Sequence, residues 1–77
     1  MPAMLTAGQV LDGYFLETRA KLLEIAANLD RFDRAADAAA LRHDPRQAFV
    51  QNALKILSTP APAADRAEQI QRLYSLS

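Results

Sequence analysis

The chain has 77 residues, of which 51% are apolar, nine basic residues balance nine acidic ones, and there is no cysteine. These values fit one small domain over residues 1–77 with a marginal core and no disulfide, and we expect a cytoplasmic protein. They disfavour a general nucleic-acid binder, which normally carries a basic excess, and no apolar run reaches the ~20 residues of a membrane span.

A long first helix is predicted over residues 7–40. One stripe of mostly apolar residues, called the seam below, recurs at alternating spacings of four and three, as the buried side of a helix requires. The seam comprises Leu11, Phe15, Thr18, Leu22, Ile25, Leu29, Phe32, Ala36 and Ala39. Strands would instead require alternation by two, which is absent.

A second apolar stripe lies on the same helix away from the seam. It is formed by Leu16, Ala20, Leu23 and Ala27, and we call it the leucine–alanine line. Leucines that alternate with small residues allow a second helix to approach closely. Either the third helix of the same chain or a second copy could occupy this line. Because so small a domain gains most from burying apolar surface between subunits, the sequence favours a homodimer.

The start of the first helix is marked by capping residues. Thr6 and Gln9 fit a capping box, in which each side chain binds an otherwise unpaired backbone N–H group. Gly8 and Gly13 weaken this prediction, because glycine costs about 1 kcal/mol relative to alanine inside a helix. An alternative is a turn at residues 12–13, with the helix starting after it.

A second helix is predicted over residues 45–58 after a turn at residues 41–43. Asp44 has the position of an N-cap and Pro45 that of the first helical residue. Its predicted apolar face contains Phe49, Val50, Ala53, Leu54, Ile56 and Leu57. The short connection predicts an antiparallel arrangement with the first helix.

Two prolines at positions 60 and 62 end the second helix, because neither can continue it. A third helix is predicted over residues 63–74. Its inward-facing residues are expected to be Ala67, Ile70, Leu73 and Tyr74. The predicted fold is therefore all-α, a long helix followed by two short ones in an antiparallel bundle that dimerisation completes.

Few residues in the sequence are candidates for catalysis, metal binding or anion binding. His43 is the single histidine, and Glu17 and Glu24 share a face with Lys21 between them, which is typical of a solvated surface rather than a metal site. The serines lie at helix ends or in the tail, without a base nearby. Basic residues around the turn alternate with aspartates, which favours ion pairs over an anion site. We expect no catalytic, metal or cofactor residues.

Arg19 is the one charge inside the wide apolar sector of the first helix. Residues three and four positions away offer it no carboxylate. It could extend to solvent along its own aliphatic stem, or form a buried ion pair with Asp65 or Glu68 and so hold the third helix in place.

Taken together, the residues predict a non-enzymatic interaction or structural module that pairs with itself or with another protein. A small helix-turn-helix nucleic-acid binder is the second hypothesis. Asp65 and Glu68 argue against it, because they lie near the start of the would-be recognition helix, which should approach phosphates. A carboxylate metal or cofactor site between helices is the third.

Overall fold

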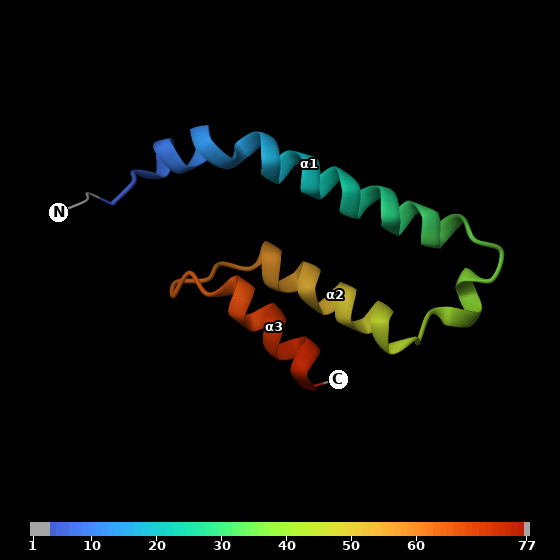
Figure 1. The fold of residues 1–77 in the computed structure, drawn as a ribbon. Helices are drawn as coiled ribbons and strands as arrows, with labels where there is room; N and C mark the ends of the chain where they lie inside the picture. The colour runs from blue at the N-terminus through green and yellow to red at the C-terminus, as the bar shows by residue number, and fades with distance from the viewer. Residues whose placement is uncertain (1–3, 77) are drawn as a thin grey trace. The chain divides into compact units, whose positions relative to one another are not determined.

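The computed structural model describes the backbone of residues 4–76 and the side chains of residues 4–73, and its elements are helical throughout (Figure 1). They are the α-helix α1 (Ala7–Arg34), the short 3₁₀ helix η1 (Ala38–Leu41), and the α-helices α2 (Pro45–Ser58) and α3 (Arg66–Leu76). The described residues contain no strand, which confirms the all-α prediction. The chain divides into two units, Met1–Ala36 and Asp37–Ser77, and each is described by itself.

The first helix starts where its capping residues predict. The Thr6 hydroxyl accepts from the Gln9 backbone N–H at 3.1 Å, and the Gln9 side-chain carbonyl accepts from the Thr6 backbone N–H at 2.9 Å. This is a complete capping box, so two of the helix's free backbone donors are satisfied. Helix α1 continues through Gly13 without a break, and the alternative of a turn at residues 12–13 is wrong.

The end of α1 differs from the prediction. The helix stops at Arg34 rather than near residue 40, because Ala35 has an extended backbone with φ −67° and ψ 143°. Beyond Phe32 the seam consists of alanines, which bury too little area to stabilise further turns. The alanines form the separate helix η1 instead.

Helix α2 has the predicted bounds and the predicted cap. The Asp44 carboxylate accepts from the backbone N–H of Arg46 at 2.8 Å, and Pro45 occupies the first turn. At the other end, Thr59 has an extended backbone with φ −99° and ψ 137°, which the following proline favours. Local sequence signals therefore determine both ends of this helix.

Helix α3 starts later than predicted, at Arg66 rather than residue 63. Pro62 lies inside a turn that the Ala64 N–H closes by donating to the Ala61 carbonyl at 2.8 Å. Ala64 then has φ 54°, a left-handed conformation that costs a non-glycine residue about 1–2 kcal/mol. The helix begins only after this reversal. The Arg66 guanidinium reaches back to the Thr59 carbonyl at 3.0 and 3.2 Å and so bridges the corner.

Helices α2 and α3 pack against each other and run in opposite directions (Figure 1). The partly buried apolar residues of the two helices are Phe49, Val50, Ala53, Leu54, Ile56, Ile70 and Leu73, which is most of the predicted apolar set. Ala67, which was expected to face inward, is exposed, and Leu57 is 44% exposed, so the packing of α2 on α3 covers neither residue. The side chain of Tyr74 lies outside the described residues. The bundle arrangement with α1 and the single-domain organisation stay predictions.

Candidate interaction surface

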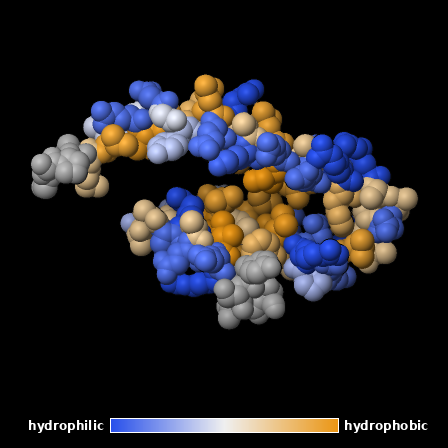
Figure 2. Space-filling model, in the orientation of Figure 1, coloured by the Kyte–Doolittle hydropathy of each residue, from blue (hydrophilic) through white to orange (hydrophobic). Residues whose placement is uncertain are grey.

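Helix α1 carries the main apolar surface of the described chain. Every residue from position 7 to position 24 is exposed. The large apolar residues among them range from 40% exposure at Val10 to 77% at Leu16; the others are Leu11, Tyr14, Phe15, Leu22 and Leu23. Figure 2 shows such hydrophobic residues reaching the surface along α1 between hydrophilic ones. So many exposed large apolar residues on one helix suggest a binding surface.

The leucine–alanine line lies on one face of α1, because the helix is continuous through all four of its residues. Leu16 is 77% exposed and Leu23 is 54% exposed, Ala20 is exposed, and Ala27 is partly buried. Gly13 extends the line toward the N-terminus, and a Cβ atom placed there would have no neighbour within 4 Å. The line is therefore a shallow stripe in which two leucines project between small residues.

The seam lies on nearly the opposite side of α1, since successive helical residues are separated by about 100°. Leu11, Phe15 and Leu22 on it are exposed, whereas Ile25, Leu29 and Phe32 are partly buried. With 28 residues α1 is about 42 Å long, whereas the 14 residues of α2 span about 21 Å. Helix α2 is therefore about half as long as α1.

A third apolar stripe lies on α1 that the periodicity of the seam does not predict. Val10 and Tyr14 are both exposed and lie one turn apart, outside the seam and the leucine–alanine line. Their i,i+4 spacing was the signal that would have revealed them. They widen the apolar surface at the N-terminal half of the helix.

The charged residues of α1 and α3 form contacts mainly within their own helices. Lys21 pairs with Glu17 at 3.2 Å, and Arg72 pairs with Glu68 at 2.6 Å. Asp65 accepts from the Gln69 side-chain amide at 2.8 Å. Arg19 is exposed and lies in the other unit from Asp65 and Glu68, so its proposed buried ion pair with either carboxylate stays a prediction.

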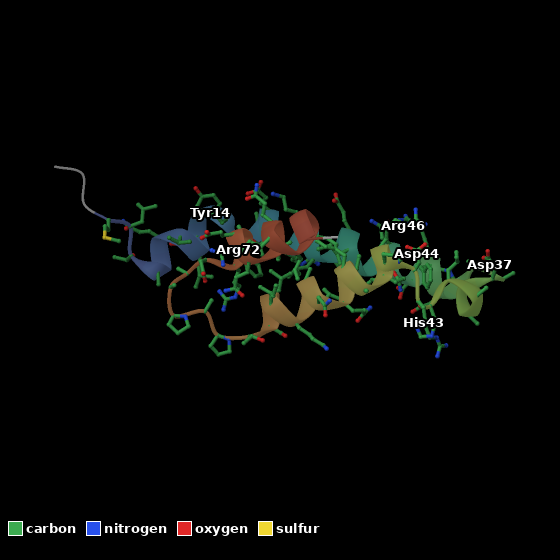
Figure 3. All side chains as sticks on the ribbon, turned by 90° about the horizontal axis from the view of Figure 1, so that it is seen from below. Tyr14, Asp37, His43, Asp44, Arg46 and Arg72 are labelled. Carbon is green, nitrogen blue, oxygen red and sulfur yellow. The ribbon has the colours of Figure 1, made fainter. Side chains whose placement is uncertain are left out.

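The turn before α2 contains the strongest charge interaction. Figure 3 places Asp44 and Arg46 together at the start of α2, with His43 in the preceding turn. The guanidinium donates to both carboxylate oxygens of Asp44 at 2.9 Å. These side-chain hydrogen bonds, with the backbone N–H of Arg46, lower the pKa of Asp44 from 3.8 to about 2. An ion pair thus occupies this end of α2, as predicted from the alternating charges.

Over the described part of the chain, no three His, Asp or Glu side chains are grouped in a way that could hold a metal ion. None of the helices within residues 4–76 combines the length and the apolar character needed to cross a membrane. Comparisons with protein-family models, curated proteins and solved structures found no match.

Proposed function

We propose that this protein is a non-enzymatic module that self-associates through the apolar surface of α1. In this proposal two copies form a homodimer in the cytoplasm, and the leucine–alanine line is the contact between them. The observation that carries the proposal is the exposure of Leu16 and Leu23 beside Ala20 on an uninterrupted helix. Burying one such leucine contributes about 1–2 kcal/mol at these exposures, and a symmetric dimer buries each leucine twice.

A second copy fits the line better than α3 does. The partly buried apolar residues of α3 are Ile70 and Leu73, and α3 already packs against α2. A second α1 offers the same stripe over its full length, with leucines and small residues in matching positions. An isologous contact of this kind needs no additional partner.

The proposed dimer would complete the predicted antiparallel bundle. The α2–α3 hairpin has partly buried apolar residues, and α2 is about half as long as α1. Because the seam and the leucine–alanine line lie on nearly opposite sides of α1, a hairpin on the seam leaves the line free for the second copy. Such a bundle gives each face of α1 an apolar neighbour.

Light scattering coupled to size-exclusion chromatography tests the proposal. The expected mass at micromolar concentration is twice the 8.5 kDa of one chain. A mass of one chain under these conditions would overturn the homodimer.

A further inference from the structure

The leucine–alanine line has the spacing of a short coiled-coil contact. Starting from Gly13, its residues follow at intervals of three and four, so small residues occupy one core position of the heptad and leucines the other. With Gly13, Ala20 and Ala27 at the first position, Leu16 and Leu23 fall at the position that leucine occupies in two-stranded coiled coils, while small residues replace the β-branched ones usual at the first position.

The charges beside the line are arranged asymmetrically. Asp12 and Arg19 lie along one edge of the line, and Glu17 and Glu24 lie along the other. Glu17 is already paired with Lys21 at 3.2 Å. Within the described residues, Arg19 and Glu24 form no ion pair, and both are exposed. Two opposite charges on opposite edges of one contact line are therefore available to a partner.

In a parallel, in-register pair, a residue on one edge faces the residue five positions later on the other edge of the partner helix. Arg19 then faces Glu24 of the partner copy, and two-fold symmetry makes this pair twice. Asp12 faces Glu17 of the partner copy, where Lys21 offsets the carboxylate charge. The symmetric layers consist of leucine against leucine and alanine against alanine.

Antiparallel pairing on the same line brings like charges together. If Leu16 faces Ala20 of the second copy, Arg19 faces its own symmetry mate, and so does Glu17. If Leu23 faces Ala20 instead, Glu17 faces Glu24 on both sides of the two-fold axis. Like charges opposite each other across a helix pair are unfavourable. The parallel pair also has one such contact, Asp12 against Glu17, on each side, but only the parallel pair adds the two Arg19–Glu24 attractions, so the edge charges favour the parallel orientation.

We infer that two copies of α1 pair in parallel and in register along the leucine–alanine line, and that Arg19 of each copy binds Glu24 of the other. This inference rests on the proposed function and adds the orientation of the pair and the charges that specify it. Arg19 thereby gains a carboxylate partner that its own helix does not provide.

Charge reversal tests the orientation with Arg19→Glu and Glu24→Arg. Each variant alone places like charges opposite each other twice, and we expect its dimer dissociation constant to rise about tenfold. Mixing the two variants in equal amounts restores both ion pairs in the heterodimer. The heterodimer fraction should therefore exceed the roughly one-half that random exchange gives. The heterodimer should also associate as tightly as the wild-type dimer. Native mass spectrometry measures the heterodimer fraction, and dilution in light scattering measures the affinity.

A matched control uses Asp37→Arg and Arg42→Glu, which change the net charge equally at exposed residues outside α1. This control mixture should exchange at random. Asp12→Arg adds a second test, because in the parallel pair it replaces repulsion from Glu17 by attraction and should tighten the dimer. Random exchange of the Arg19 and Glu24 variants, or a weaker dimer with Asp12→Arg, would overturn the inference while the wild-type dimer persists. A wild-type mass of one chain would instead overturn the proposed function.

Discussion

The apolar residues of helix α1 and those of the α2–α3 hairpin differ in how far neighbouring residues cover them. The hairpin is made of short helices joined by a proline corner, and its apolar residues have neighbours within the same unit. Helix α1 is twice as long as α2, and all of its residues from position 7 to position 24 are exposed. Helices in proteins gain most of their stability from packing of an apolar face. The hairpin is therefore supported by contacts within its own unit, whereas the N-terminal half of α1 exposes its apolar residues, which we propose that a second copy covers.

The largest effect is expected from a charge placed on the leucine–alanine line. Ala20→Arg should convert the homodimer to monomers at micromolar concentration, because a guanidinium in a close apolar contact without a partner costs several kcal/mol. Light scattering coupled to size-exclusion chromatography measures the mass.

Asn28→Arg is the matched control, since it adds the same side chain to α1 at an exposed position away from the line. This variant should keep the mass of the wild type. Equal loss of the dimer in both variants would mean that the contact lies elsewhere on α1.

The hairpin should respond to a truncation that removes buried area. Leu54→Ala is expected to lower the free energy of unfolding by about 1–2 kcal/mol, because a partly buried leucine loses a fraction of the 2–5 kcal/mol of a fully buried one. Leu57→Ala in the same helix is the control, and its effect should be smaller since Leu57 is 44% exposed. Urea denaturation followed by circular dichroism compares them. Equal losses would show that burial does not distinguish the two leucines.

The sequence predicted those features that depend on a few neighbouring residues. Thr6 and Asp44 cap the two helices they were expected to cap, because N-caps are made by side chains two or three positions from their donors. The end of α1 at Arg34 was not predictable from alanine's helix propensity, since packing decides whether a final turn persists. The left-handed Ala64 was equally hidden, because that conformation normally belongs to glycine or asparagine.

For the candidate surface too, the sequence predicts what neighbouring residues determine but not what distant residues determine. Periodicity identified Leu16, Ala20, Leu23 and Ala27 as one stripe, and a continuous helix guarantees that they share a face. What covers that stripe depends on surfaces outside α1, which spacing along one helix does not describe. The predicted pair of Arg19 with Asp65 or Glu68 illustrates this limit, because both acidic residues have polar partners within α3 or at its start.

A smaller effect is expected at the N-cap of α2, and this effect should depend on pH. Asp44→Ala should lower the melting temperature by about 4–8 °C at neutral pH, because it removes the N-cap and the pairing with Arg46. Since folding lowers the pKa of Asp44 from 3.8 to about 2, this stabilisation is complete above pH 3.8 and disappears as the pH falls through about 2.

Thermal melts of wild type and Asp44→Ala between pH 2 and pH 7 measure this dependence. Asp44→Asn is the control, because asparagine can also cap a helix but does not titrate. Its difference from Asp44→Ala should not vary over the same range. A wild-type advantage that stayed constant down to pH 2 would mean that the carboxylate charge does not contribute.

The smallest effect is expected at His43, in the turn that joins the two compared regions. Its side chain is exposed, it precedes the cap residue Asp44, and no group of metal-binding side chains forms in the described chain. His43→Gln keeps a polar side chain of similar reach, so the melting temperature, the dimer mass and the pH profile should match those of wild type. Inductively coupled plasma mass spectrometry of both purified proteins is the most sensitive check, because it detects a ligand role directly. Stoichiometric metal in wild type that disappears in His43→Gln would give this turn a function that neither α1 nor the hairpin explains.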